Sequence, residues 1–373
     1  MTSINMQQCF VRNEQLKHYP KVSIDSISSR FQLIVSSTSN IYGKCLFVLT
    51  IFSSTLVHCH DLLYSSMDLS LSGQLFKTFL YVLLEIVMFS AFYFNYNHRL
   101  LKQINDHWNA LQIDYDYETR KYFWTHKAIY RWLTYALLSI IYISFHFHLW
   151  NDNDMIKYKS KFAFTIFCFE WFICAPMHYF HHFCMTCINM DLPILAQTAV
   201  QFNLIKLKKL LQKSAKAKKS LNIKDIQNIR HKYLLTYYLV DEINQIMSPL
   251  LLCRFGFFLL IAYHSSYDLF YAEQDQSNKG LLFITSSLVL IAVLLYTHSS
   301  IKIHEKSLET LAIVYKLSLK TDSLRILNEI SLFLNHSEIG FSFGGMFMLT
   351  TSSLSTLFSI LITVIIALPS FSS

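Results

Sequence analysis

Seven apolar segments, each about as long as a bilayer crossing, constrain this chain more than any other feature. A membrane-spanning helix needs about 20 predominantly apolar residues. The segments that meet this requirement are 41–63, 75–97, 127–150, 161–188, 247–270, 280–301 and 352–371. None of them alternates in the in-and-out manner of a membrane barrel strand. The sequence therefore predicts an all-α membrane protein with seven transmembrane helices.

The composition agrees with a chain that lies in lipid. Charged residues make up only 15% of the sequence, against roughly 25% in soluble proteins, and hydrophobic residues make up 53%. Glycine (7) and proline (5) are scarce, so long flexible linkers are not expected. No phosphate-binding loop, nucleophile elbow or metalloprotease pattern is present, and we expect neither an enzyme nor a nucleic-acid-binding protein.

Lysine and arginine divide unevenly between the predicted loops. The segments on the side of the N-terminus (1–40, 98–126, 191–246 and 302–350) hold 23 of them, whereas the loops on the opposite side hold 3. Positive residues stay in the cytosol. The N-terminus is therefore predicted to be cytosolic and the C-terminus extracellular. The one glycosylation sequon, at Asn335, falls on the cytosolic side and is predicted to be unmodified.

This topology divides the chain into four parts. Residues 1–40 form a cytosolic arm, 41–301 a six-span bundle, 302–350 a cytosolic segment and 351–373 a terminal helix. Within the bundle, residues 191–246 carry apolar side chains at helical spacing. Two such stripes are Val200, Leu204, Leu207 and Leu211, followed by Ile226, Ile229, Tyr233, Tyr237 and Val240. We expect these helices to extend the spans into the cytosol and to pack on one another.

The histidines His178, His181 and His182 form an HxxHH pattern in span four. Membrane di-iron enzymes bind metal through several boxes of this kind. No second HxxHH occurs, and His146 and His148 are two residues apart and so point to different helix faces. The histidines of span four make a membrane redox enzyme the alternative hypothesis, although the other boxes that such an enzyme needs are missing. We expect no metal and no cofactor, with these imidazoles hydrogen bonded to water or to neighbouring helices; the lone Cys184–Cys187 pair is likewise not expected to bind zinc.

Several polar and aromatic residues are candidates for a ligand pocket. Glu85, Glu170 and Arg254 lie well inside spans two, four and five, where a charge is costly unless paired or hydrated. They indicate either a polar cavity or a structural hydrogen bond, and both interpretations stay open. An apolar pocket with a few polar tips suits a small ligand. The pocket candidates are Glu85, Tyr142, Phe145, His146, Phe167, Glu170, Trp171, Tyr263, His264 and Phe283.

The C-terminal third resembles the insect gustatory receptor family. A basic helix, 231–244, enters span five, and after span six comes a cytosolic stretch with a short amphipathic segment at 330–347. The residues Phe341–Phe347 are similar to the family's segment that ends in a small residue, glycine and an aromatic. The family's terminal signature is Thr-Tyr, five hydrophobic residues and Gln-Phe. Thr363 and Phe371 match its ends; Val364, Pro369 and Ser370 depart from it.

The resemblance implies a chemosensory, ligand-gated, non-selective cation channel of the plasma membrane. It implies a homotetramer, or a heterotetramer with other gustatory receptors, whose terminal helices line the pore. A small-molecule tastant would bind in the outer half of the six-span bundle. Sugars, bitter compounds, carbon dioxide and internal metabolites all remain open. Helical spacing separately puts Thr363, Ala367, Ser370 and Phe371 on one face of the last span. A solute carrier is a third hypothesis, but no internal repeat supports it.

Overall fold

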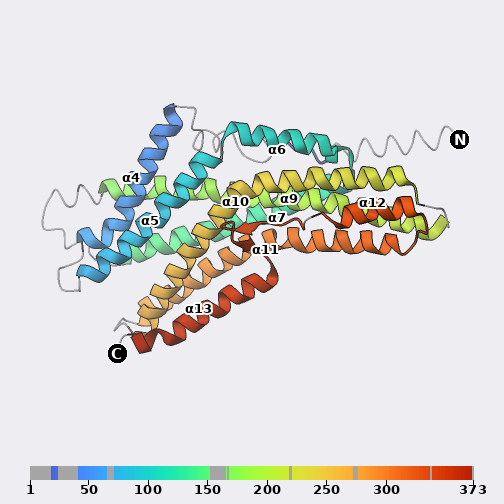
Figure 1. Ribbon diagram of the computed structural model, residues 1–373. Coiled ribbons are helices and arrows are strands. Elements are labelled where there is room, and N and C mark those ends of the chain that lie inside the picture. Colours follow the sequence, from blue (N-terminus) through green and yellow to red (C-terminus); the bar gives the residue numbers. More distant parts are fainter. Residues whose placement is uncertain are drawn as a thin grey trace.

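The computed structural model describes residues 18–23, 41–64, 71–151, 165, 168–217, 221–271, 276–336 and 338–371. Long helices dominate it and run side by side (Figure 1). The described elements are α4 (Ile41–Tyr64), α5 (Leu71–Asn95), α6 (His98–Leu111), η1 (Ile113–Tyr115), α7 (Tyr117–Asn151), η3 (Glu170–Cys174), α9 (Ala175–Ala217), α10 (Ile223–Tyr271), α11 (Gln276–Ser318), α12 (Leu324–Leu334), β1 (Ser342–Phe343), β2 (Phe347–Met348) and α13 (Thr351–Phe371).

The predicted spans fall on helices. Spans one, three, five, six and seven lie within α4, α7, α10, α11 and α13. Span two ends two residues beyond α5, and span four is described from residue 168 through η3 into α9. By length and apolarity alone, three helices of the described residues are long enough to cross a bilayer, or four if α5 and α6 count as one bent span.

Three helices are much longer than a bilayer needs. Helices α9, α10 and α11 have 43, 49 and 43 residues. At 1.5 Å per residue, α10 measures about 74 Å, more than twice the hydrocarbon thickness of about 30 Å. Both apolar stripes noted in the sequence lie on α9 and α10, and their side chains are buried or half-buried where these helices pack on one another. The helical spacing at 200–240 thus corresponds to the contact between two long helices.

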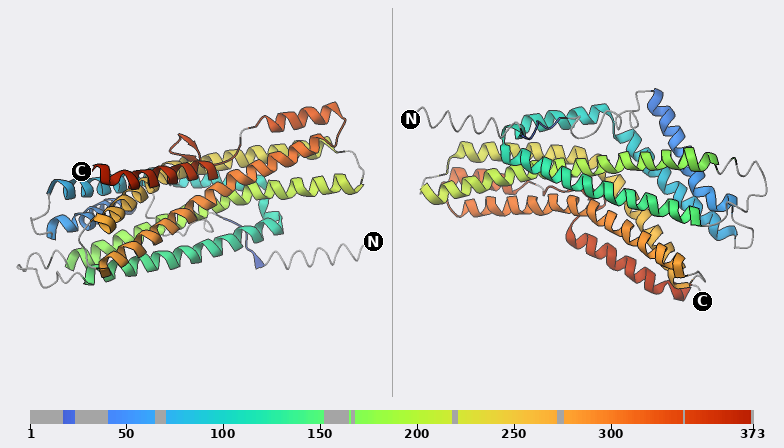
Figure 2. Two further views of the ribbon diagram at one scale, coloured as in Figure 1. Left: turned by 90° about the horizontal axis from the view of Figure 1, so that it is seen from below. Right: turned by 180° about the vertical axis from the view of Figure 1, so that it is seen from behind.

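Helix α9 is the centre of the bundle. Every residue from Cys184 to Val200 is buried, because α7, α10, α11 and α4 all pack against this helix. The views from below and behind show α9 running among the other long helices of the bundle (Figure 2). A helix that is covered on all sides must carry apolar or internally paired residues around its whole circumference. Residues 184–200 are accordingly apolar apart from a few hydroxyl, amide and acidic side chains.

The chain bends by 59° between α5 and α6. Asn97 makes the break, because its side-chain oxygen accepts the backbone N–H of Leu100 at 3.0 Å and caps α6. Helix α6 then lies along the bundle beside α10 (Figure 1), with one apolar face inward. The buried side chains of this face are Leu100, Leu101, Ile104, Trp108 and Leu111.

The amphipathic segment expected at 330–347 is divided between the end of a helix and a hairpin. Helix α12 begins earlier, at Leu324, and ends at Leu334, with Ile326, Ile330 and Phe333 buried. Residues 342–348 instead form a small antiparallel hairpin, in which Ser342 pairs with Met348 and Phe343 with Phe347. Its turn consists of Gly344, Gly345 and Met346, and both glycines have positive φ (61° and 74°), a conformation that residues in a helix do not adopt.

Candidate functional site

The terminal helix α13 begins with a reciprocal cap. The backbone N–H of Ser353 donates to the Thr350 hydroxyl at 3.0 Å, and the N–H of Thr350 donates to the Ser353 hydroxyl at 2.7 Å. These bonds satisfy backbone donors that the first turn leaves unpaired. Beyond this point α13 diverges from the bundle, and its contacts within the chain are mainly with α10 (Figures 1 and 2). The start of α13 is therefore fixed, whereas most of its surface is left uncovered by its own chain.

The two faces of α13 differ in chemistry. One face packs on the bundle through Leu354, Leu357 and Phe358, and the Phe358 ring lies 6.2 Å from the ring of Phe258 on α10. The opposite face is exposed and carries a stripe of hydroxyl side chains at helical spacing. The members of this hydroxyl stripe are Ser352, Thr356, Ser359 and Thr363. The last three donate to the carbonyl four residues earlier at 2.8–3.1 Å, so the helix tolerates them without a partner from its own bundle.

The β1–β2 hairpin is clamped onto α10. The N–H of Ser342 donates to the Asn244 side chain at 2.9 Å, and the Asn244 amide donates to the Ser342 hydroxyl at 3.0 Å. One turn further along α10, the Ser248 hydroxyl accepts the N–H of Gly345 at 2.9 Å. A side chain at Gly344 would lie 2.7 Å from Leu252, the next turn of the same face. The hairpin that leads into α13 is thus held by three successive turns of α10.

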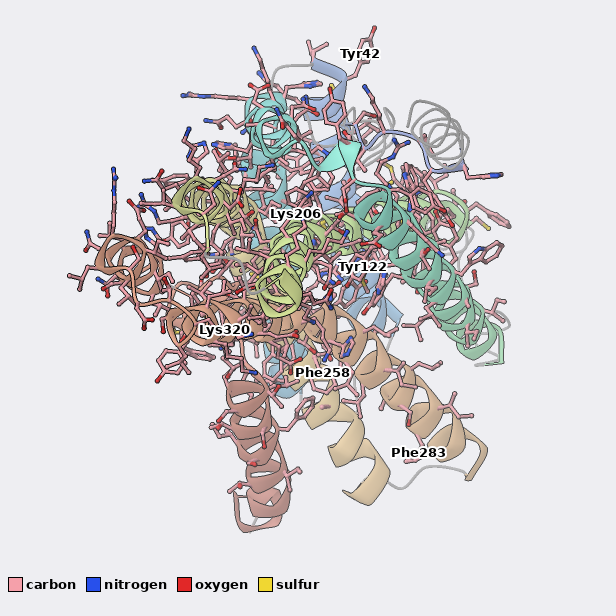
Figure 3. The ribbon with its side chains drawn as sticks, turned by 90° about the vertical axis from the view of Figure 1, so that its right-hand side faces the viewer. Tyr42, Tyr122, Lys206, Phe258, Phe283 and Lys320 are labelled. Carbon is pink, nitrogen blue, oxygen red and sulfur yellow. The ribbon has the colours of Figure 1, made fainter. Side chains whose placement is uncertain are left out.

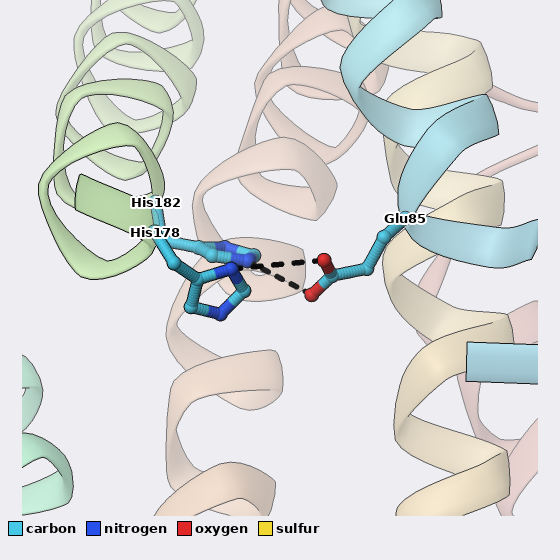
Figure 4. A group of neighbouring side chains, drawn as sticks. All are labelled: Glu85, His178 and His182. Carbon is cyan, nitrogen blue, oxygen red and sulfur yellow. Dashed lines mark hydrogen bonds and ion pairs between the residues drawn. The ribbon is translucent and has the colours of Figure 1, made fainter. Parts of the chain in front are cut away.

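Two histidines of α9 meet a carboxylate of α5. Glu85 is buried, and its Oε1 lies 3.2 Å from His182 Nε2 while its Oε2 lies 3.7 Å from His178 Nδ1 (Figure 4). The two imidazoles come from positions i and i+4 of α9, so they project from the same face. The ring of Phe89, one turn after Glu85, contacts the edge of His182 at 5.3 Å between centroids. The contact of Glu85 with the two histidines thus joins spans two and four inside the bundle.

Sequence comparison decides the family. The profile of the family described as 7tm Chemosensory receptor matches residues 44–371. The chain belongs to this family. The fold of the receptor is similar to that of the insect olfactory receptor OR5 from Machilis hrabei, with a TM-score of 0.62 and 10% identity, over 98% of each chain. No curated protein sequence matches the receptor.

Family membership confirms the class expected from the terminal signature, a multi-pass chemosensory receptor. Family membership and the similarity to OR5, which extends over nearly the whole chain, together confirm the helical membrane fold. The receptor's helices therefore have the arrangement of a known chemoreceptor, and the open questions concern its ligand, its assembly and its pore.

Only two of the predicted pocket side chains lie in the described part of the receptor. Glu85 is buried against His178 and His182, and Phe283 on α11 is 63% exposed (Figure 3). The others fall outside the described side chains: Tyr142, Phe145, His146, Phe167, Glu170, Trp171, Tyr263 and His264. Of the four predicted pore residues, Thr363 is described and exposed on the hydroxyl stripe, whereas the side chains of Ala367, Ser370 and Phe371 are not described.

Arg254 contacts a different part of the bundle from Glu85. Its guanidinium donates to the Thr186 hydroxyl at 3.2 Å and lies 4.4 Å from the centre of the Tyr296 ring. A cation over an aromatic face is stabilised by the ring quadrupole. These contacts join α9, α10 and α11, and they correspond to the structural hydrogen bond that the sequence left open beside a polar cavity.

Sequence reasoning missed the most buried ion pair of the described residues. Asp191 of α9 is fully buried and lies 3.2 Å from Lys127 Nζ and 2.8 Å from Arg131, both on α7. The signal was present, since Lys127 and Arg131 are one helical turn apart and Asp191 interrupts a long apolar run. The pairing needed the tertiary contact between α7 and α9, which no local pattern gives.

Loss of the hairpin clamp should be measurable. Replacing Asn244 by Ala leaves the Ser342 N–H without its acceptor, and we expect the receptor to be destabilised by about 1–3 kcal/mol. The midpoint of thermal unfolding of the detergent-solubilised receptor checks this. The control is Gln245→Ala, an exposed neighbour on α10, which should leave the midpoint unchanged. Equal midpoints for both variants would contradict the clamp.

Proposed function

We propose that the receptor is a ligand-gated, non-selective cation channel of the plasma membrane, of the gustatory type, opened by a small-molecule tastant. Four copies, or copies with related receptors, surround a pore lined by α13. The observation that carries this proposal is the hydroxyl stripe on the face of α13 opposite to its packing face. A lone lipid-facing helix gains nothing from such a stripe, whereas a water-filled conduit between symmetry-related helices is lined well by it.

The chemistry of α13 suits weakly selective cation passage. Its hydroxyl and carbonyl oxygens present partial negative charge, and residues 351–371 contain no ionisable side chain. A pore without a ring of acidic residues lacks the strong field that selects one cation over another. In the proposed pore, Ala367 and Ser370 continue the stripe toward the outer mouth, and Phe371 lies at its end.

Helix α10 supports a route from ligand to pore. The predicted tastant pocket includes Tyr263 and His264 on α10, and the same helix holds the hairpin through Asn244 and Ser248. It also packs on α13 through Phe258 and Phe358. A tastant opens the channel only if it binds the open arrangement more tightly than the closed one. In this proposal a shift of α10 moves both the hairpin that precedes α13 and the face of α13 that packs on α10.

Current recording tests the function. Cells that express the receptor should show inward cation current to at least one member of a panel of sugars, bitter compounds, carbon dioxide and common metabolites. With sodium outside the cell and potassium inside, the current should reverse near 0 mV, because α13 carries no charged ring that selects one cation over the other. Solute uptake without current, from a receptor shown to be at the cell surface, would instead favour a carrier.

A further inference from the structure

We propose that Glu85, His178 and His182 form a zinc-binding site that ties α5 to α9. The carboxylate of Glu85 and one nitrogen from each imidazole all lie within 4.8 Å of one another. His178 and His182 are one turn apart on α9, and their rings are 4.5 Å apart between centroids. The carboxylate of α5 faces the same space as the two rings (Figure 4). Three potential ligands from two helices thus converge on one point.

The donor set matches what Zn²⁺ takes. Zinc is bound by histidine nitrogen and carboxylate oxygen at about 2.0–2.2 Å, and two histidines with one glutamate leave a fourth position open. Tetrahedral ligands at that distance are about 3.4 Å from one another. The nitrogen–oxygen separations are 3.2 Å from His182 to Glu85 Oε1 and 3.7 Å from His178 to Glu85 Oε2. All three donor atoms lie within 4.8 Å of one another, so they must move closer together to surround one ion at this distance.

The surroundings suit a closed site with one accessible side. The side chains of Glu85 and His178 are 2% and 9% exposed, so they lie inside the bundle, whereas His182 is 23% exposed. His182 is the most exposed of the three ligands, so a water molecule that completes the coordination would approach from its side. Nitrogen donors disfavour Mg²⁺ and Ca²⁺, which take oxygen, and Zn²⁺ binds such sites more tightly than Fe²⁺.

The sequence alone did not indicate this site. The HxxHH pattern directs attention to three neighbouring histidines, but the group of three consists of His178, His182 and a carboxylate 93 residues before His178. A bound ion would stabilise the arrangement of α5 and α9 that brings the ligands together. Since α5 also packs on α10, the site includes a residue of a helix that contacts the proposed path to α13. Zinc binding itself does not depend on the receptor being a channel.

Equilibrium binding of Zn²⁺ to the purified full-length receptor tests the proposal. After treatment with a chelator, the receptor in lipid nanodiscs should bind one zinc ion per chain, with little competition from Mg²⁺ or Ca²⁺. The variants Glu85→Gln and His182→Ala should weaken binding by at least about 100-fold, since even outer-sphere partners of metal ligands are worth 10- to 100-fold. The control His231→Ala, an exposed cytosolic-side histidine, should bind normally.

A second variant separates loss of a ligand from loss of the fold. His182→Cys supplies a thiolate, which is itself a zinc ligand, and it should retain binding. All variants should elute from size exclusion as the wild type does. Absent or non-saturable zinc binding, binding that survives both ligand variants, or tighter binding of Fe²⁺ than of Zn²⁺ would each overturn the site. Because the readout is bound metal, this outcome is independent of the current recordings.

Discussion

Replacing Asp191 by Ala should destabilise the receptor by about 3–5 kcal/mol, the cost of leaving a buried charge without its partner. Asp191 is fully buried and Lys127 is 4% exposed, so the Lys127 ammonium would be left buried without its counter-charge. Arg131 would lose its 2.8 Å partner at the same time. We expect a markedly lower midpoint of thermal unfolding and a smaller yield of monodisperse protein, both measured in detergent by fluorescence-detected size exclusion.

The matched control is an exposed pair between the same two helices. Glu118 on α7 and Lys209 on α9 are 2.9 Å apart, with side chains 60% and 48% exposed. Exposed pairs contribute about 0–1 kcal/mol, so Glu118→Ala should leave the midpoint nearly unchanged. The double variant Lys127→Met with Asp191→Leu should recover part of the loss, because apolar side chains of similar size replace the charges. A midpoint for Asp191→Ala equal to that of Glu118→Ala would contradict the expected cost of the buried, unpaired charge.

The positions of the spans were predictable because they depend on a single local property. About 20 apolar residues are required to cross the hydrocarbon of a bilayer, and a chain with seven such segments has few alternatives to a seven-span membrane fold. The helical extensions were also predictable, since Val200 and Leu204 recur at a spacing that only a helix brings to one face. Features that depend on a helical period or on the length of an apolar segment could therefore be predicted from the sequence.

The contacts between spans were not predictable from one sequence. Glu85 was recognised as costly inside the bilayer, but its partners His178 and His182 lie on another helix 93 and 97 residues away. Asp191 was placed at the first residue of a cytosolic segment, so its buried position was missed. The hairpin at 342–348 was not predicted either, although Gly344 and Gly345 inside an apolar segment are a turn signal.

The terminal helix could be predicted from the sequence only in part. Helical spacing put Thr363, Ala367 and Ser370 on one face from the sequence alone. The structure extends the described part of this face back through Ser359, Thr356 and Ser352, and places the packing residue Leu354 on the other side. That opposition required knowledge of which face of α13 contacts α10, and the packing of Phe358 on Phe258 supplies it.

Replacing Thr363 by Phe should abolish agonist-evoked current or reduce it more than tenfold. In a fourfold assembly the substitution places four aromatic rings at one level of the proposed conduit, and a ring of bulky apolar side chains both narrows and dewets a pore. Thr363→Ser keeps the hydroxyl and should retain current, whereas Thr363→Val keeps the shape without the hydroxyl and should lower conductance. Whole-cell and single-channel recordings, corrected for surface expression, measure these effects.

The control for added bulk is Ile362→Phe. Ile362 is the preceding residue, is also exposed, and lies about 100° around the helix from Thr363, off the hydroxyl stripe. It should change conductance and ion selectivity little, because its ring would not enter the conduit. If Thr363→Phe and Ile362→Phe leave conductance and selectivity equally intact, then the hydroxyl stripe does not face the ion path. The exposed face of α13 would then contact lipid or a neighbouring subunit, and the pore would have to be sought on another helix.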